Sequence, residues 1–159
     1  MDRWRRWLIV SVMLVVLTSL FSGGTAVYAS SIMDEVTDTE TEESFSEDTN
    51  YGLLRGNNLN SGTVKIQKIS SGKLSIYGVT QCHHACDKVY LSLYLERKVN
   101  GSYGTYKYWE FTANNATSLS RTIEVIVPSG TYYRVRGYHA AKDGAKESTS
   151  TLTQGILIK

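Results

Sequence analysis

The densest group of reactive side chains lies between residues 82 and 86, which read Cys-His-His-Ala-Cys. In a chain exported from the cell, two cysteines normally form a disulfide, which requires their Cα atoms to lie within about 7 Å of each other. Four residues of extended strand would separate Cys82 from Cys86 by roughly 13 Å. A bridge therefore predicts a turn over Gln81–Asp87, and closing so small a ring is expected to contribute about 2 kcal/mol to stability.

A zinc site is the alternative chemistry for the same segment. Both thiolates and one histidine, His83 or His84, would then be ligands at about 2.0–2.3 Å from the metal. However, a C-x3-C spacing around two adjacent histidines does not match a common zinc-binding pattern. We therefore predict a disulfide between Cys82 and Cys86, and no metal or other cofactor.

Tyrosines and arginines alternate along two later segments, Tyr103–Phe111 and Tyr132–Ala140. Because alternate residues of a strand share a face, each segment would place tyrosines on one side of a sheet. The candidate binding residues on that side are Tyr106, Tyr108, Tyr132, Arg134, Arg136 and Tyr138. Exposed rings between arginines suit a glycan, an anionic polymer or a protein partner. Cross-strand pairs that only stabilise the sheet are the alternative.

The sequence offers little support for catalysis. The acids after Tyr51 are scattered over separate segments and are Asp87, Glu96, Glu110, Glu124, Asp143 and Glu147. The chain has no G-x-S-x-G, P-loop or H-E-x-x-H motif. We predict no catalytic residue and no enzymatic activity.

The first thirty residues predict export. A basic stretch with three arginines precedes Leu8–Phe21, a run without charge, and Val27 and Ala29 are small residues at the positions that a signal peptidase requires. An uncleaved anchor would need about 20 apolar residues, and Ser22–Gly24 interrupts the run too early. We predict a signal peptide over residues 1–29, cleavage after Ala29, and a secreted protein without stable membrane insertion.

Charge is divided unevenly after the predicted cleavage site. Residues 30–50 hold eight acids and no base, whereas residues 51–159 hold fourteen bases and six acids. So polar a stretch cannot bury enough surface to offset the entropy of ordering it. We therefore predict a disordered acidic segment and linker over residues 30–62. A second hypothesis is that this segment masks the basic domain by charge attraction. The net charge of +2 does not favour a nucleic-acid partner.

From Thr63 onward, apolar and polar residues alternate with the period of a β-strand. Turn residues such as Asn100-Gly101 separate seven strand segments. These segments cover residues 63–68, 74–79, 88–96, 103–111, 119–127, 132–140 and 147–158. The pattern predicts an all-β domain over residues 63–159, a seven-stranded antiparallel sandwich of the immunoglobulin or fibronectin type III kind.

Two local features refine this prediction. The stretch from Val127 to Val135 resembles the turn before the sixth strand of such domains, which makes Tyr133 the expected structural residue of a tyrosine corner. In an up-and-down strand order, the loops after the second, fourth and sixth strands share one end. That end would gather His83, His84, His139 and Asp143 into a second candidate binding surface; simple solvation of the loop histidines is the alternative.

A wider set of residues resembles small secreted proteins of Gram-positive bacteria that form a family of unknown function. The matching runs are Cys86–Val89, Leu95–Arg97, Asn100–Ser102, Trp109, Asn115–Thr117, Gly130–His139, Glu147–Ser148 and Gly155–Ile156. The resemblance implies export and a β-sandwich, and it brings no activity, cofactor or catalytic residue.

Together these observations predict an exported, non-enzymatic binding module of the cell envelope or extracellular space. Its expected partner is an extracellular glycan, a wall polymer or a protein. The alternative is a bacteriocin-like or membrane-active effector that its acidic leader holds inactive.

Overall fold

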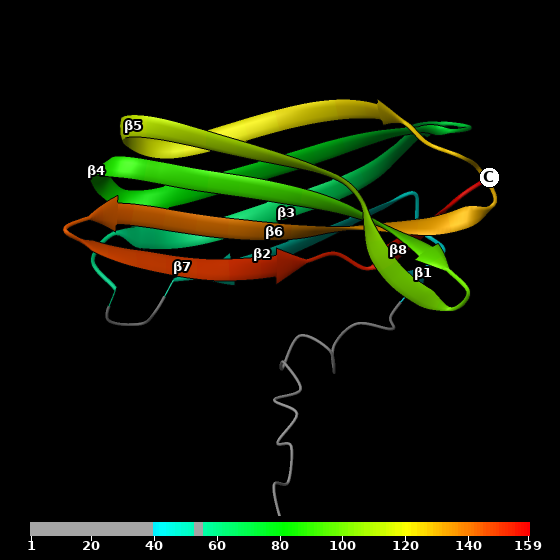
Figure 1. The fold of residues 1–159 in the computed structure, drawn as a ribbon, viewed down its shortest axis with the longest axis horizontal. Coiled ribbons are helices and arrows are strands. Elements are labelled where there is room, and N and C mark those ends of the chain that lie inside the picture. Colours follow the sequence, from blue (N-terminus) through cyan, green and yellow to red (C-terminus); the bar gives the residue numbers. More distant parts are fainter. Residues whose placement is uncertain (1–39, 53–55) are drawn as a thin grey trace, which may run out of the picture. The chain divides into compact units, whose positions relative to one another are not determined.

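The computed structural model describes residues 40–52 and 56–159, and every regular element in these ranges is a β-strand (Figure 1). The strands are β1 (Glu40–Thr41), β2 (Phe45–Tyr51), β3 (Leu59–Ser70), β4 (Lys73–Val99), β5 (Ser102–Ile126), β6 (Thr131–Asp143), β7 (Ala145–Leu152) and β8 (Gly155–Ile158). None of the residues in these ranges forms a helix that could cross a membrane. The predicted signal peptide and its cleavage site lie outside the described residues.

All eight strands belong to one hydrogen-bonded sheet in the order β1-β8-β6-β4-β3-β2, with β5 added to β4 and β7 added to β6. Two strands are far longer than the usual five or six residues: β4 has 27 residues and β5 has 25. The first part of β4 pairs with β3, and the part from Lys88 to Arg97 pairs with β6. Each long strand therefore runs through two layers of the fold.

A corner in β4 and β5 separates these layers. The pairing moves from Gln81↔Ser118 to Cys86↔Ala116, so the four residues 82–85 of β4 oppose the single residue 117 of β5. Extra residues of this kind bend a strand and increase its twist. On β5 the bend coincides with Asn115, whose φ of 49° lies in the left-handed region that asparagine tolerates.

The core lies between the two halves of β4. Before the corner its inward residues are Leu74 and Ile76, and after it they are Leu91, Leu93 and Leu95, all fully buried. The halves approach closely, because a Cβ atom on Gly78 would lie 2.7 Å from the Leu93 side chain. One continuous sheet thus folds over its own apolar face.

The predicted all-β fold is confirmed, but several strand boundaries differ. The second and third predicted segments form one strand, β4, and the fourth and fifth form β5, since the corner bends the ladder without ending it. The last predicted segment is divided into β7 and β8. The sheet is mixed, because β1 pairs parallel with β8. The immunoglobulin-like assignment stays a prediction.

The predicted disorder of residues 30–62 is wrong for the part that the structure describes, residues 40–52 and 56–62. Strand β2 pairs residue by residue with β3, from Phe45↔Gln67 to Tyr51↔Ser61. Its polar side chains accept backbone hydrogen bonds from the far end of the chain: Asp48 Oδ2 accepts the Leu152 N–H at 2.8 Å, and Ser46 Oγ accepts the Gln154 N–H at 2.9 Å. These bonds join β2 to the end of β7 and nearly close the sheet into a barrel.

Two local predictions are confirmed. The Tyr133 hydroxyl donates to the Pro128 carbonyl at 2.9 Å, which makes the expected tyrosine corner. The β4–β5 hairpin turns at Asn100 and Gly101, with φ of 51° and 84°. Two consecutive positive φ values are typical of a type I′ turn, which Asn-Gly favours.

Candidate functional site

A row of three stacked side chains crosses the outer face of β5, β4 and β6. Tyr108 lies directly opposite Tyr94, with ring centroids 6.2 Å apart and ring planes inclined by 20°. On the other side of Tyr94 lies Arg136, whose guanidinium carbon is 4.3 Å from the Tyr94 ring centroid. Tyr108 is 64% exposed. We call Tyr108, Tyr94 and Arg136 the aromatic row.

A buried carboxylate holds the arginines of this face in place. Glu96 is only 7% exposed, and its two oxygens accept hydrogen bonds from Arg134 Nε at 2.7 Å and Arg136 Nε at 3.0 Å. Such charge-assisted bonds are stronger than neutral ones. The Arg136 side chain remains 37% exposed, against 13% for Arg134. Glu96 therefore orients a guanidinium that solvent still reaches.

At the hairpin end of the same face, Glu40 of the acidic segment contacts side chains of β4 and β5. Lys98 forms an ion pair with Glu40, and the Tyr103 hydroxyl donates to the same carboxylate at 3.2 Å. The Arg134 guanidinium lies 4.0 Å from the Tyr103 ring centroid, and the Lys98 ammonium lies 5.9 Å from the Tyr132 ring centroid. Burial, more than the adjacent carboxylate, raises the pKa of Tyr103.

The structure corrects the predicted position of Tyr106. The pairing shifts by one residue between Leu95↔Lys107 and Glu96↔Thr105, so Tyr106 is the extra residue of a β-bulge. Because the bulge interrupts the alternation of faces, Tyr106 does not lie beside Tyr108. It packs against the core, with its ring edge-on to Tyr133 at 6.1 Å.

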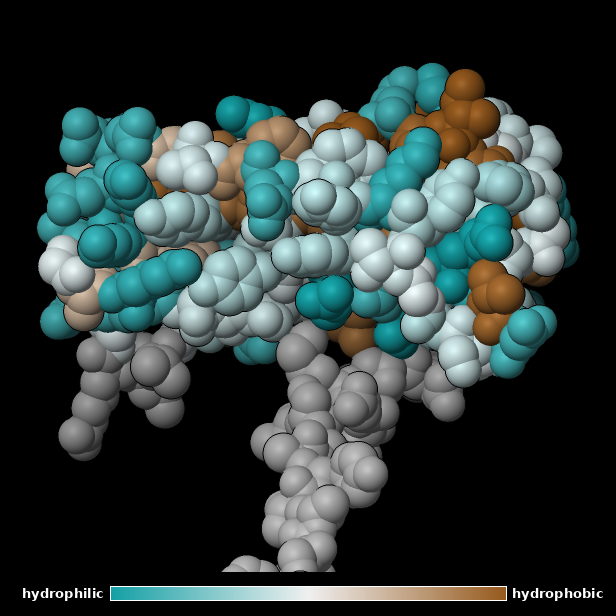
Figure 2. Space-filling model, viewed as in Figure 1, coloured by the Kyte–Doolittle hydropathy of each residue, from teal (hydrophilic) through white to brown (hydrophobic). Residues whose placement is uncertain are grey.

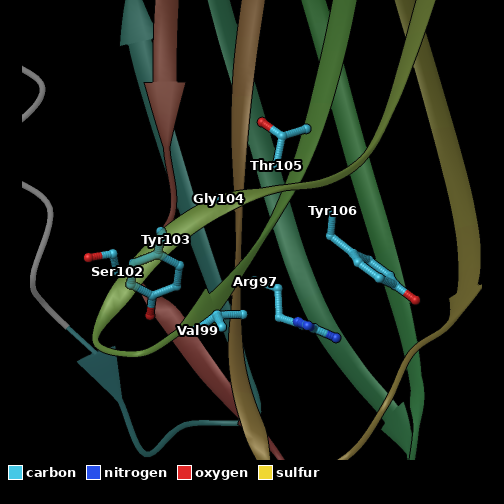
Figure 3. A pocket seen from close by; sticks show the side chains of 7 residues that line it. All are labelled: Arg97, Val99, Ser102, Tyr103, Gly104, Thr105 and Tyr106. Carbon is cyan, nitrogen blue, oxygen red and sulfur yellow. The ribbon is translucent and has the colours of Figure 1, made fainter.

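The bulge also shapes a shallow hollow beside the hairpin tip. Its volume is about 350 Å³, and its lining residues are Arg97, Val99, Ser102, Tyr103, Gly104, Thr105 and Tyr106. Arg97 and Tyr106 point to the same side of the hairpin, whereas Tyr103 points away from them (Figure 3). The Arg97 guanidinium lies 5.4 Å from the Tyr106 ring centroid, so these two lining side chains already interact with each other.

The outer face has no continuous apolar band. In the view of Figure 2, which has β4, β6 and β7 in front, the surface over these strands is mostly hydrophilic to neutral, and hydrophobic residues gather toward one end. A surface of this kind suits a polar ligand better than an apolar one.

The strand pairing brings the three predicted segments to one end of the sheet. Lys88 is flanked by Asn114 on β5 and by Lys142 on β6. His84 Nε2 lies 3.0 Å from Asp143 Oδ2, and both side chains are exposed. The His83 backbone N–H donates to the Asn58 carbonyl at 3.0 Å. Whether this end binds anything stays a prediction.

His139 is not part of that surface. It is fully buried, with Nδ1 3.0 Å from Thr80 Oγ1 and Nε2 2.9 Å from Thr151 Oγ1. Burial lowers its pKa to about 4. Its ring packs against two glycines, since a Cβ on Gly62 would lie 2.2 Å from the ring and one on Gly137 2.6 Å from it. Because these two residues have no side chain, the ring fits inside the core.

Cys82 and Cys86 are free thiols in this structure. The Cys86 thiol lies 3.6 Å from the His84 carbonyl oxygen and 3.9 Å from the Asn58 carbonyl oxygen. Burial raises the pKa of Cys82 to about 12 and raises that of Cys86 as well. A protonated thiol is a poor nucleophile and a poor metal ligand. No group of three or more His, Cys, Asp or Glu side chains that could hold a metal occurs in residues 40–52 and 56–159.

Comparison with known proteins identifies the family but not its activity. A model described as "Family of unknown function (DUF6147)" matches residues 24–155. The chain belongs to the DUF6147 family. No curated protein matches it. Among solved structures, chicken MD-1, crystallised in complex with lipid IVa, is similar over 74% of this chain and 95% of its own length, with 11% sequence identity and a TM-score of 0.31.

Two residues of the candidate site in this DUF6147 chain were missed by sequence analysis, namely Tyr94 and Glu96. Both belong to the alternation that runs from Lys88 to Glu96, which already marked them as the polar side of a strand. That signal gives the face but not the neighbours. Only the pairing of β4 with β5 and β6 places Tyr94 between Tyr108 and Arg136.

Proposed function

We propose that this chain is an exported, non-enzymatic binding module that recognises a sugar-containing anionic polymer of a bacterial cell envelope. The observation that carries the proposal is the aromatic row, with an exposed Tyr108 at one end and the Arg136 guanidinium at the other. The export signal over residues 1–29 and an origin in Gram-positive bacteria belong to the same proposal.

The row has the properties of a preformed platform. Tyr108 offers a flat ring with an apolar face and a polar hydroxyl, and its stacking on Tyr94 limits the freedom that it would lose on binding. Arg136 is held at its Nε by Glu96 and presents a planar charge suited to carboxylate or phosphate groups. A sugar ring on Tyr108 and an anionic group near Arg136 would therefore meet side chains that are already in place.

The sheet alone gives no need for so exposed a tyrosine. A cross-strand aromatic pair contributes about 0.2–1 kcal/mol to stability, and Tyr94 already makes a second contact with Arg136. Replacing Tyr108 should therefore change the free energy of unfolding little and weaken binding of the polymer strongly. A purely structural role would give the opposite result.

The alternative is an effector that its acidic leader holds inactive, and part of that leader belongs to the sheet. Strand β2 lies within the acidic stretch and pairs along its whole length with β3, so its removal would strip an edge from the sheet. We propose no catalytic role, and we retain both the immunoglobulin-like sandwich and a Cys82–Cys86 disulfide formed after export as proposals.

The test is co-sedimentation of the purified protein with bacterial wall sacculi. We expect the wild-type protein to be retained and Tyr108→Ala and Arg136→Gln to bind about tenfold more weakly. Tyr77→Ala is the matched control, because Tyr77 is an exposed tyrosine on the opposite layer. Absence of wild-type retention, or an equal loss in the Tyr77 variant, would contradict the proposal.

A further inference from the structure

Three lysines stand directly opposite one another on three adjacent strands. Lys88 on β4 pairs with Lys142 on β6, and Lys142 pairs with Lys146 on β7. All three are exposed. With neighbouring strands about 4.8 Å apart, the row spans about 10 Å. Like charges placed directly opposite each other destabilise a sheet, so this lysine row works against folding.

Two of the three carboxylates near the lysine row are engaged elsewhere. Asp143 lies against His84 at 3.0 Å, and Glu147 accepts three backbone N–H groups on another side of β7. Asp87 is exposed at the corner next to Lys88. None of the ion pairs found in the described part of the chain includes any of the three lysines. Their repulsion is therefore not relieved by acidic partners.

Two tyrosine rings and one asparagine lie next to the lysine row. The Lys146 ammonium lies 4.7 Å from the Tyr90 ring centroid and 5.4 Å from that of Tyr138, so two rings hold it on the outer face. Asn114 lies opposite Lys88 on the β5 side. An anion over this row would meet ammonium groups from three strands.

We infer that the lysine row binds successive phosphate groups of a linear polymer. Ammonium groups are compact charges with three donors each and bind phosphate without requiring a fixed plane. Neither the hollow at the hairpin tip nor the one beside β1 is lined by any of the three lysines. A row of exposed lysines that extends across three strands fits a chain of anions better than one small anion. The inference deepens the proposed function, on which it rests for the polymer's path along the outer face.

Binding of linear inorganic polyphosphate to the purified protein at low ionic strength tests the inference. We expect the triple variant Lys88→Gln/Lys142→Gln/Lys146→Gln to bind about tenfold or more weakly than the wild type. The matched control is Lys68→Gln/Lys107→Gln/Arg121→Gln, which removes the same charge from other surfaces and should retain most of the affinity. Equal losses in both variants would overturn the inference, because net charge alone would explain them.

Two further arms identify the source of the phosphate. Orthophosphate at the same phosphate concentration should compete poorly, and phosphatidylglycerol vesicles should bind more weakly than polyphosphate. Strong competition by orthophosphate would replace the polymer with a single-anion site, and stronger vesicle binding would replace it with a lipid surface; either result overturns the inference.

Folding and the proposed function are controlled separately. Because the row is repulsive, Lys142→Gln alone should unfold at the same or a higher temperature than the wild type, and it should still weaken polyphosphate binding. Tyr108→Ala should leave polyphosphate binding at the lysine row largely intact. If Tyr108→Ala keeps wild-type wall retention while the lysine variants lose polyphosphate binding, only the proposal for the aromatic row fails. If Tyr108→Ala loses wall retention while the lysine variants still bind polyphosphate, only the inference for the lysine row fails.

Discussion

The Glu96 carboxylate accepts a hydrogen bond from Arg136 Nε at 3.0 Å, and this bond holds the charged end of the aromatic row. The same carboxylate binds Arg134 at 2.7 Å. One largely buried acid thus balances two guanidinium groups, and the surface above them keeps an excess of positive charge.

Replacing this acid tests that arrangement. Glu96→Gln should lower the free energy of unfolding by about 1–3 kcal/mol, because two guanidinium groups would lose the buried counter-charge that they share. Urea denaturation measures the change. Glu110→Gln, an exposed acid on the same outer face, is the control and should change stability by less than about 0.5 kcal/mol. Equal effects of the two substitutions would show that Glu96 is not a structural anchor.

Gly62 is predicted to tolerate no added side-chain atom. A Cβ at this position would lie 2.2 Å from His139 Cγ, and the ring is held by one hydrogen bond at each of its nitrogens. Gly62→Ala should destabilise the fold by about 3 kcal/mol or more. Gly104→Ala, where nothing lies within 4 Å of the added atom, should be nearly neutral in the same thermal unfolding experiment.

Stability should fall in mildly acidic solution because of His139. Its pKa is about 4 in the folded protein, below its ordinary value of 6.5, so the unfolded chain binds the proton more tightly. The contribution is therefore fully present above pH 6.5 and is lost as the pH falls from 6.5 toward 4, by about 3 kcal/mol in total.

The control for this prediction is His139→Gln, which lacks the titrating ring. The difference in unfolding free energy between wild type and variant, measured from pH 4 to pH 8, should depend on pH with that sign. A difference that stays constant over this window would contradict the buried, neutral histidine.

Glu147 is predicted to hold the entry to β3. Its carboxylate accepts the backbone N–H groups of Asn57, Asn58 and Leu59 at 2.8–3.0 Å, and these bonds lower its pKa. Glu147→Gln should cost about 2 kcal/mol and speed hydrogen exchange at these three amides. If exchange accelerates no more there than across β6, the role assigned to Glu147 is wrong.

The cysteine pair should oxidise without rearrangement of the fold. The corner places residues 82–85 of β4 opposite a single residue of β5, which shortens the span between the two cysteines relative to an extended strand. Both thiols are protonated at neutral pH, because burial raises the pKa of each. In a glutathione redox buffer, we expect the intact mass to fall by two hydrogens and alkylation to be blocked. The thermal midpoint should rise, as expected for a small ring that contributes about 2 kcal/mol. Persistent alkylation of both thiols would exclude the bridge.

Features encoded by neighbouring residues were predictable from the sequence. Asn100-Gly101 requires only its own turn geometry, and the Tyr133 hydroxyl reaches back only five residues to Pro128. The period of two after Thr63 likewise identified the inward and outward faces of most strands. The presence of Tyr108 on an exposed face follows from that period.

Features that depend on distant partners were not predictable. The composition of Phe45–Tyr51 indicates disorder, yet Asp48 and Ser46 receive backbone N–H groups from more than 100 residues away. The bulge that turns Tyr106 inward is set by its register with β4. His139 is buried because Gly62 and Gly137 leave room for its ring. The sequence around His139 does not show that Gly62, on another strand, lies against it.

The most direct test of the central claim is the retention of Tyr108→Ala by wall sacculi, measured beside the wild type and Tyr77→Ala. We expect the wild type and the Tyr77 variant to be retained alike, and the Tyr108 variant, with a nearly unchanged unfolding temperature, to bind about tenfold more weakly. Retention of the Tyr108 variant equal to that of the wild type would contradict the claim that the aromatic row is the binding surface.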